Sequence, residues 1–554
     1  MNQEYDYIIV GAGSSGCVLA NRLSADPGTS VLLVESGPPD SHALIQMPRG
    51  IGKMLTPGNP HIWSYSASKG KGRDAEDWLK GRTLGGSSSV NGMVYLRGHP
   101  AEYDAWEAAG CTGWGWKDIG RCYRAMEDHE LGASPSRGVG GPLKVSMHPA
   151  GHPLCEAVIA AAGQAGVARV EDLNEALDGG IGYQPRTIWR GKRWSAARAF
   201  LAPVRVRGNL EVRTGTDVLR VVFEGRRAAG VELRSGGTVS VARARREVIL
   251  SAGALNTPKL LQLSGVGPAA LLARHGIALV ADIPAVGRHL LEHRCIMLQV
   301  RVREGSLNRE FAGVRLFKNL LRYFSRGNGP MTHAAHEVCA FVKTRPELAR
   351  PDAELGIGLY SIGVEDGKIV LEKEPGMTWV GYFTNPDSEG SVEIAGRDPD
   401  VAPLIDANYL STENDRRHSI DLVRFMRKIL MQPALRKYVV GETQPGLACT
   451  SDDQLAEAFF THGSTAFHAA GTCRMGADAA SVVDPQLRVR GLDGLRVVDT
   501  SIMPTLISGN TNGPAMAMAM RAAELILAPP GLDPGPAPAA VAARQQAIPN
   551  AVAP

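Results

Sequence analysis

The chain has 554 residues, 44% of them hydrophobic and 21% charged, proportions that are ordinary for a soluble globular protein. Its 60 basic and 56 acidic residues leave a net charge of +4 without a long basic block, so we infer no nucleic-acid partner. A chain of this length exceeds one hydrophobic core, and we expect two or more domains that are interleaved in sequence.

The cysteine pattern and the start of the chain bear on location. The eight cysteines include no Cys-x-x-Cys pair, which argues against a disulfide framework or a zinc site and favours a reducing cytoplasm. Residues 1–6 lead into an apolar run without the features of a signal peptide. No apolar stretch reaches the ~18 residues of a spanning helix. We expect a cytoplasmic protein. If its electron acceptor is dissolved in the membrane, the protein would also contact the inner membrane face peripherally.

The first expected element is a buried strand at residues 5–10, a short β-branched apolar run. A glycine-rich turn follows at 11–16, then helical apolar spacing over 17–24 and a strand, 30–34, that ends at Glu35. Glycines in this setting let the backbone approach a pyrophosphate at a helix N-terminus, and the acid accepts from ribose hydroxyls. The alternative is a tight glycine turn and a solvated glutamate. The first interpretation places a dinucleotide against Gly11, Gly13, Ser14, Ser15, Gly16 and Glu35.

Residues 81–93 form a Gly- and Ser-rich segment with neither helical nor strand periodicity. Adjacent glycines and small hydroxyl side chains offer a row of backbone N–H groups, which suits a phosphate and a flat ring. A flexible linker is the alternative. The interspersed Arg82, Leu84, Val90 and Asn91 are atypical of linkers. We therefore interpret the segment as a second cofactor-binding loop.

The remaining elements are less regular. Three tryptophans near 106–116 are typical of a packed surface turn. Alternating apolar residues predict strands at 209–222, 230–234 and 246–251, then at 341–343, 379–384 and 390–394, and a helix at 414–431. The Pro- and Ala-rich residues 529–554 cannot bury a core and are expected to be a disordered tail.

Several segments resemble the glucose–methanol–choline (GMC) flavoprotein oxidoreductases. The loop at 81–93 with its continuation to Gly98 is similar to their first signature, and residues 251–267 are similar to their second. Residues 286–293 resemble a further element of the family, with His289 where asparagine is usual. The resemblance runs from about residue 4 to about 527 and extends to the segments 465–476, 496–504 and 509–516, similar to the family's catalytic block. Within the family the chain most resembles bacterial alcohol and choline dehydrogenases and aryl- or furfuryl-alcohol oxidases.

The resemblance implies an α/β fold, which becomes α+β when the whole chain is considered. A Rossmann-like FAD-binding domain is interleaved with a substrate domain built on an antiparallel or mixed sheet. We expect the FAD-binding domain to comprise 1–155, 205–295 and 466–528, and the substrate domain 156–204 and 296–465, with the tail at 529–554.

Two residues are expected to carry catalysis. His468 lies in an apolar frame, and a neutral imidazole suits removal of a hydroxyl proton near neutral pH. In the family such a histidine is followed 44 positions later by asparagine or histidine, which here is Asn512. An amide donates to a substrate oxygen but takes no proton, so Asn512 would position the alkoxide while hydride passes to flavin N5. The alternatives are a core histidine and a helix N-cap.

The same resemblance implies the rest of the cofactor site. The expected contacts are Arg82, Gly85, Gly86, Ser87, Asn91, Gly92, Met93, Val218, Ala252, Gly253, Asp499, Asn510 and Pro514. Some relatives tether the flavin through a histidine just before the loop asparagine, where this chain has Val90. We therefore expect non-covalent FAD. A helix that begins near Pro514 would direct its positive end at the ring and favour the reduced anion.

The expected reaction is oxidation of a primary alcohol to an aldehyde, with electrons passed to oxygen, a quinone-type acceptor or an artificial one. Glu337 and Phe467 are candidate substrate contacts, with a solvated or strand-end glutamate as the alternative for the first. His333 and His336 lack further ligands nearby, so no metal is expected. Competing hypotheses are non-redox or light-driven chemistry on the same fold, of hydroxynitrile-lyase or fatty-acid-decarboxylase type, and a flavin-binding sensor or scaffold. The particular alcohol and the oligomeric state stay open.

Overall fold

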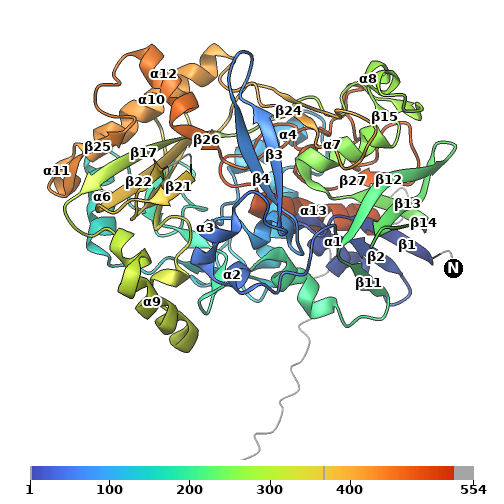
Figure 1. Cartoon of the computed structure of the whole chain (residues 1–554), viewed down its shortest axis with the longest axis horizontal. Coiled ribbons are helices and arrows are strands. Elements are labelled where there is room, and N and C mark those ends of the chain that lie inside the picture. Colours follow the sequence, from blue (N-terminus) through green and yellow to red (C-terminus); the bar gives the residue numbers. More distant parts are fainter. Residues whose placement is uncertain (1–2, 366–367, 529–554) are drawn as a thin grey trace, which may run out of the picture.

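The computed structural model describes residues 3–365 and 368–528. Figure 1 shows two large sheets at opposite ends of the molecule, with a long hairpin between them. The tail predicted at 529–554 lies outside the described residues.

The first large sheet has the strand order β11-β2-β1-β14-β13-β12, and β27 pairs with β14. Its strands are β1 (Gln3–Val10), β2 (Val31–Val34), β11 (Leu210–Arg213), β12 (Thr216–Glu224), β13 (Arg227–Ser235), β14 (Thr238–Leu250) and β27 (Leu495–Val497). The strands β11, β2, β1, β14 and β27 are parallel, and Ile8 lies opposite both Leu32 and Val248. These apolar β-branched runs are buried, as is typical of parallel strands that are covered on both faces.

The strand predicted at 209–222 is divided in two. The chain leaves β11 through Gly215, which has a φ of +61°. A left-handed residue turns the chain out of the extended course, so β12 pairs with β13 at the other edge instead of extending β11.

The second large sheet has the order β25-β17-β22-β19-β18-β7, and β26 pairs with β17. Its strands are β7 (Gly180–Tyr183), β17 (Arg294–Val302), β18 (Val338–Val342), β19 (Ala353–Gly358), β22 (Gly376–Phe383), β25 (Val439–Gln444) and β26 (Gly463–Thr465), and each pairing is antiparallel. Residues alternate between its faces: Ile296 and Leu298 enter a core, whereas Cys295 and Met297 face the central cavity.

Helices α1 (Ser14–Leu23) and α13 (Asn512–Leu527) pack together against the first sheet, as Figure 1 shows. Met516, Met518 and Met520 are buried in the core there and pack the helix against the rest of the protein. The other α-helices are α2 (Ala43–Gln46), α3 (Ile51–Met54), α4 (Pro100–Ala108), α5 (Trp116–Met126), α6 (Pro153–Gln164), α7 (Gly253–Leu263), α8 (Ala269–Arg274), α9 (Gly313–Arg326), α10 (Glu413–Leu430), α11 (Pro433–Arg436) and α12 (Asp452–Thr461).

Smaller sheets join the two large ones. The hairpin of Figure 1 consists of β3 (Ile62–Ser68) and β4 (Ala75–Gly81), which extend into β24 (Leu404–Asp406) and β23 (Ser391–Glu393). The remaining short strands are β5 (Glu127–His129), β6 (Leu143–Met147), β8 (Pro185–Arg186), β9 (Ile188–Trp189), β10 (Lys192–Arg193), β15 (Val266–Gly267), β16 (Ala281–Asp282), β20 (Ile362–Glu365) and β21 (Lys368–Leu371).

Each large sheet is therefore assembled from separate stretches of the chain. The first takes its strands from 3–34, 210–250 and 495–497, and the second from 180–183, 294–383 and 439–465. A Rossmann-like sheet and an antiparallel sheet are thus interleaved in sequence, as expected. The domain boundaries given above stay predictions.

Candidate active site

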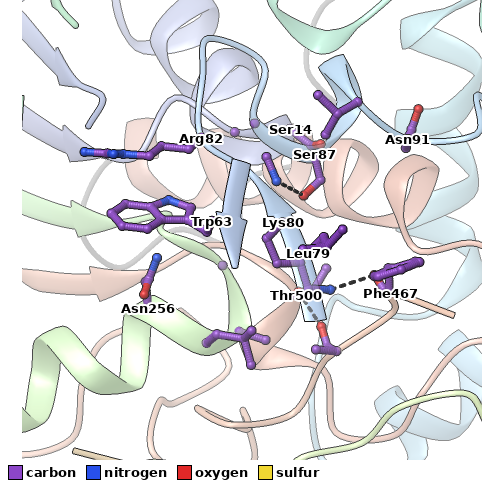
Figure 2. Close-up of a pocket in the computed structure, with 18 of the residues that line it drawn as sticks. Ser14, Trp63, Leu79, Lys80, Arg82, Ser87, Asn91, Asn256, Phe467 and Thr500 are labelled. Atoms are coloured by element: carbon purple, nitrogen blue, oxygen red, sulfur yellow. Dashed lines mark hydrogen bonds between the residues drawn. The ribbon is translucent and has the colours of Figure 1, made fainter. Parts of the chain in front are cut away.

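A cavity of about 770 Å³ lies between the carboxyl edge of the first sheet and the inner face of the second. Its wall combines the ends of β1 and β2, the hairpin, the Gly/Ser loop, the start of α7 and residues 464–469 and 510–512. Figure 2 shows Arg82 above Trp63 on one side and Phe467 on the other. Ligands of α/β proteins bind at this edge of a parallel sheet.

The glycine turn before α1 is shaped to hold a ligand. A Cβ at Gly11 would lie 2.6 Å from the Ser251 carbonyl oxygen, and one at Gly16 would lie 1.9 Å from the Gly11 oxygen. A Cβ at Gly13 would meet only the Ser251 oxygen, at 3.9 Å, because Gly13 borders the cavity. Gly11 and Gly16 thus allow close backbone packing, and Gly13 leaves room for a phosphate at the start of α1.

Glu35 stabilises this turn from the end of β2. Its carboxylate accepts hydrogen bonds from the backbone N–H groups of Ala12 and Gly37, both at 2.9 Å. Burial raises its pKa to about 7 despite these bonds. Glu35 borders the cavity and is not the solvated strand end of the alternative interpretation.

The Gly/Ser loop packs directly on the glycine turn. Gly85 and Gly86 have φ values of +84° and +51°, and a Cβ at Gly86 would lie 2.7 Å from Gly13 Cα. The buried Arg193 donates to the Asn91 carbonyl and side-chain oxygens, both at 2.8 Å. The loop is therefore a fixed wall, not a linker.

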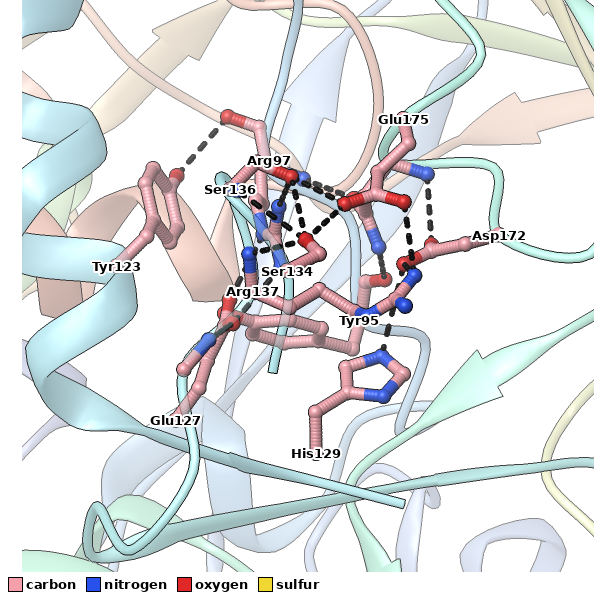
Figure 3. A network of polar contacts seen from close by, with 12 residues as sticks. Tyr95, Arg97, Tyr123, Glu127, His129, Ser134, Ser136, Arg137, Asp172 and Glu175 are labelled. Carbon is pink, nitrogen blue, oxygen red and sulfur yellow. Dashed lines mark hydrogen bonds and ion pairs between the residues drawn. The ribbon is translucent and has the colours of Figure 1, made fainter. Parts of the chain in front are cut away.

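The continuation of this loop is anchored by a buried polar network (Figure 3). Arg97 forms a bidentate ion pair with Glu127 at 2.7 and 2.8 Å, and both side chains are fully buried. Tyr95 donates to the same carboxylate at 2.5 Å, and Tyr123 donates to the Arg97 carbonyl at 2.9 Å. Paired and hydrogen-bonded in this way, the buried charges fix where the loop leaves the cavity.

Opposite this wall, His468 lies in a chain of hydrogen bonds. Its Nδ1 is 2.9 Å from Nδ1 of His293, and Nε2 of His293 is 2.8 Å from the Thr384 carbonyl oxygen. A carbonyl only accepts, so Nε2 of His293 carries the proton and its Nδ1 accepts from Nδ1 of His468. A neutral His468 therefore has its lone pair on Nε2, 3.0 Å from Nδ2 of Asn510.

The electrostatics keep this imidazole neutral. Burial, followed by the influence of His293 and Lys80, holds the pKa of His468 well below its usual value. Burial likewise lowers the pKa of His293 to about 4. The His468 backbone N–H donates to Glu292 at 2.7 Å, and Lys80 donates to the Phe467 carbonyl at 2.8 Å. The segment is thus held through its backbone, and the imidazole is held between His293 at Nδ1 and Asn510 at Nε2, where it borders the cavity.

The structure corrects the partner expected for His468. Asn512 is the first residue of α13, where its side-chain oxygen accepts from the Ser14 hydroxyl at 2.7 Å. Asn510 lies in the loop before the helix and faces the imidazole. Thr511 is the N-cap, so the N-cap alternative for Asn512 is also wrong. Asn512 borders the cavity and joins α13 to α1.

The other expected cofactor residues fall into two groups. Those that border the cavity are Gly11, Gly13, Ser14, Ser15, Glu35, Arg82, Gly86, Ser87, Asn91, Gly92, Met93, Val218, Ala252, Gly253, Asp499 and Asn510. Those that do not are Gly16, Gly85 and Pro514, whose contribution is to the packing of the turn, the loop and the first turn of α13.

Asp499 borders the cavity, but protein donors already bind its carboxylate. One oxygen accepts from the Gly253 N–H at 2.9 Å and the Thr257 hydroxyl at 2.6 Å, and the other accepts from the Ser501 N–H at 2.8 Å. Burial raises its pKa in spite of these bonds. Asp499 therefore fixes the start of α7 against the cavity wall.

The two expected substrate contacts have different positions. Phe467 borders the cavity with 39% of its side chain exposed and has a φ of +64°. The Glu337 carboxylate lies outside the cavity wall, between Arg49 at 2.5 Å, His333 at 3.1 Å and the Leu359 N–H at 2.8 Å. Because its oxygens are buried and already hydrogen-bonded, the expectation of a substrate contact at Glu337 is wrong. A solvated glutamate is wrong as well, whereas the alternative of a strand-end glutamate agrees with its position directly before β18.

Position 289 has a physical explanation for its departure from asparagine. His289 has a φ of +59°, a region in which asparagine and histidine are enriched among non-glycine residues. Its Nε2 lies 2.7 Å from the Pro504 carbonyl oxygen. His289 thus adopts a left-handed conformation that asparagine also tolerates, and it adds a contact to the segment 496–504.

Four residues of the site were not expected from the sequence: His293, Lys80, Arg193 and Tyr382. The signal for His293 was present, because it ends the quoted segment 286–293. Tyr382 stacks on His293 with ring centroids 4.5 Å apart. Lys80 and Arg193 act through backbone carbonyls, which leave no pattern in sequence.

The described residues contain no group of three or more His, Cys, Asp or Glu side chains that could hold a metal ion. Within the same ranges, no helix is long and apolar enough to cross a membrane.

A Rossmann-like sheet whose glycine turn borders the same cavity as a buried, neutral histidine is the arrangement expected of a dinucleotide-binding oxidoreductase. The GMC oxidoreductase family models match residues 5–295 and 386–519. The chain is 41% identical to an alcohol dehydrogenase [acceptor] of Pseudomonas putida, covering 94% of this chain and 96% of the relative. It is 39% identical to human mitochondrial choline dehydrogenase, covering 96% and 91%.

Among solved structures, pyridoxine 4-oxidase from Mesorbium loti matches with a TM-score of 0.84 at 32% identity, covering 94% of this chain and 98% of that one. The protein belongs to the GMC oxidoreductase family.

Proposed function

We propose that the protein binds FAD non-covalently and oxidises a primary alcohol to an aldehyde. The observation that carries the proposal is the hydrogen-bond chain that leaves the Nε2 lone pair of a neutral His468 at the cavity. Relatives named as alcohol and choline dehydrogenases support the reaction class. The intact histidine–asparagine arrangement favours it over lyase or decarboxylase chemistry.

The cavity fits a flavin dinucleotide. Gly13 leaves space at the start of α1 for the pyrophosphate, and the Gly/Ser loop presents small residues toward the same space. Arg82 lies 4.4 Å from the Trp63 ring centroid, and its Nε is buried without a protein partner among the described residues. Such a donor can be satisfied by a bound ligand.

Val90 supports non-covalent binding. Its side chain is 2% exposed and packs with Ile45, Met54 and Ile62, and it borders the cavity. A valine offers no nucleophile for a bond to the ring, so the cofactor is held by contacts alone.

The protein's part in the reaction is proton transfer and positioning. FAD, when bound, supplies the acceptor for the hydride that leaves the carbinol carbon. His468 takes the hydroxyl proton on Nε2, and Nδ2 of Asn510, 3.0 Å from that nitrogen, donates to the developing alkoxide. His293 holds the other proton of the imidazole in place. Asn512 holds α13 against α1 through Ser14.

The proposal is tested by His468→Ala. The variant should retain its flavin, because the glycine turn and the Gly/Ser loop are unchanged, but its anaerobic reduction by alcohol should slow by about 10²-fold or more. Stopped-flow bleaching of the flavin with a panel of alcohols measures this directly. Near-normal reduction in the variant would defeat the assignment. Failure of every alcohol to bleach the wild-type flavin would favour the non-redox alternatives.

The electron acceptor can be identified with the same enzyme preparation, by measuring how fast the reduced flavin is reoxidised. Reoxidation of the alcohol-reduced flavin by oxygen, a soluble quinone and an artificial dye, compared at equal concentrations, distinguishes an oxidase from a dehydrogenase. Ala466 borders the cavity and leaves space there, but one small residue does not choose between them.

A further inference from the structure

Helix α9 carries an exposed apolar stripe on the surface of the molecule. Val314, Phe317, Leu321 and Phe324 are 70%, 67%, 62% and 68% exposed. Their spacing of three, four and three residues places them on one face of the helix. Val206 and Leu279, by contrast, have no other exposed large apolar residue within four positions in sequence, and such single residues are normal on a protein surface.

A different face of the same helix is fixed to the protein. Tyr323 is 7% exposed and packs with Met47 and Met331, and Leu316 and Leu320 are partly buried against them. Two faces of α9 are therefore apolar, but only one of them packs against other residues that the structure describes. Figure 1 shows α9 projecting at the lower left edge, on the side of the molecule that carries the second sheet.

Positive charge accompanies the exposed stripe. Residues 308–329 contain five basic residues and one acid, Glu310, so this short segment carries as much net charge (+4) as the whole chain. The acid is engaged with Arg315 at 3.0 Å. The basic residues are Arg309, Arg315, Lys318, Arg322 and Arg326. Arg309 precedes the helix, and the other four lie on α9, where helical spacing places them on a flank beside the stripe.

We propose that α9 docks the protein on an anionic membrane surface, with the four apolar side chains inserted at the headgroup boundary and the basic residues on lipid phosphates. A surface helix with an apolar face and a Lys/Arg-rich flank, and no acidic residue within Gly313–Arg326, has this chemistry. A second copy of the chain fits the stripe less well. A twofold contact there would bring the two basic flanks together.

The docking face is connected to the cavity wall. Met47, which packs under α9, directly precedes the segment that leads to Ile51 and Leu55, and both of these border the cavity. A membrane at α9 would thus lie against the side of the molecule that contributes these apolar residues to the cavity. The inference stands on the surface of α9 and does not depend on the proposed reaction.

The test is sedimentation of the FAD-loaded enzyme with vesicles of phosphatidylcholine, with or without phosphatidylglycerol. We expect binding to the anionic vesicles that weakens as salt rises. Phe317→Ser/Phe324→Ser should weaken it by about tenfold or more. Lys318→Gln/Arg326→Gln should weaken it by about fivefold for each charge removed.

Matched controls use the same chemistry elsewhere on the surface. Val206 is 90% exposed, and Val206→Ser should leave vesicle binding unchanged, as should Arg397→Gln/Arg417→Gln. All variants should keep wild-type melting temperatures and activity with a soluble acceptor. The proposal would be overturned if wild-type protein bound neither kind of vesicle, or if the double-serine variant bound as well as wild type. Light scattering that reveals a dimer which the double-serine variant dissociates would also overturn it, because the face would then be a protein interface.

Discussion

At the scale of single residues, the protonation state of the proposed base is set by a backbone carbonyl that does not touch it. Thr384 requires a proton on Nε2 of His293, which leaves Nδ1 of His293 to accept from His468. Two imidazoles in series thus transmit a choice of tautomer over two hydrogen bonds. The consequence is that His293 is a positioning residue for His468.

His293→Ala removes the acceptor for Nδ1 of His468. The neutral imidazole can then carry its proton on either nitrogen, and the tautomer protonated at Nε2 cannot act as the base. We expect kcat to fall by about 10–10²-fold. His293 also lowers the pKa of His468, so that pKa should rise in the variant. The base works only when neutral, and the acid limb of the kcat/KM profile should therefore move to higher pH.

Two further variants separate positioning from packing. The side-chain oxygen of His293→Gln can accept from His468, so this variant should recover part of the lost kcat. His336 is another buried histidine at the cavity, with a pKa lowered to about 4 by burial, and no hydrogen bond joins it to His468. His336→Ala should leave the acid limb in place. An unshifted limb in His293→Ala would contradict the role of His293.

The sequence identified part of this arrangement. His468 was recognisable from its segment, and the cavity contains it. The sequence could not show whether Asn510 or Asn512 is the partner of His468, because both lie within one turn before or at the start of α13. Which side chain faces the imidazole depends on where the helix begins. Glu337 was misplaced because its partner Arg49 is 288 residues away in sequence.

At the scale of elements, two glycines of the turn between β1 and α1 are needed for different reasons. Gly16 has no room for a side chain, because a Cβ would meet the Gly11 oxygen at 1.9 Å. Gly13 has room in the protein itself and has a φ of −74°, which alanine also adopts. The first glycine is therefore needed by the fold, and the second by the ligand that the cavity holds.

This difference gives opposite expectations for two alanine variants. Gly13→Ala places a methyl group in the pyrophosphate space. Overpacking costs about 1–3 kcal/mol, which corresponds to about 5- to 150-fold weaker FAD binding. The apo-protein should melt like wild-type apo-protein. Gly16→Ala should lower the free energy of unfolding of the apo-protein by a similar amount. FAD titration and thermal unfolding of both apo-proteins measure this, and equal losses of stability would contradict it.

Local elements were the predictable part of the fold. The β1–α1–β2 unit follows from an apolar run, a glycine turn and helical periodicity within residues 5–34. The second sheet was predicted only in outline, because β7 and β18 pair across more than 150 residues of chain. Such pairing depends on tertiary packing that a single strand's pattern does not encode.

At the scale of the whole molecule, the cavity lies between two sheets whose strands alternate along the chain. Its wall includes Val10 from the first sheet, Tyr382 from the second and Val90 from the loop between them. A ligand that fills this space contacts both halves at once. Its binding energy is therefore available to stabilise the folded chain against unfolding as a unit.

This linkage and the lack of a tether at Val90 determine how the protein should respond when its cofactor is removed. Acid precipitation should release the yellow colour completely into the supernatant, and a coloured pellet would show a covalent bond. Native deflavination should lower the melting temperature. Added FAD should restore it in a concentration-dependent way, by about 2.7 kcal/mol of unfolding free energy at a hundredfold excess over Kd. Riboflavin, which lacks the pyrophosphate, serves as the control and should restore much less, because the glycine turn at Gly13 then has no ligand.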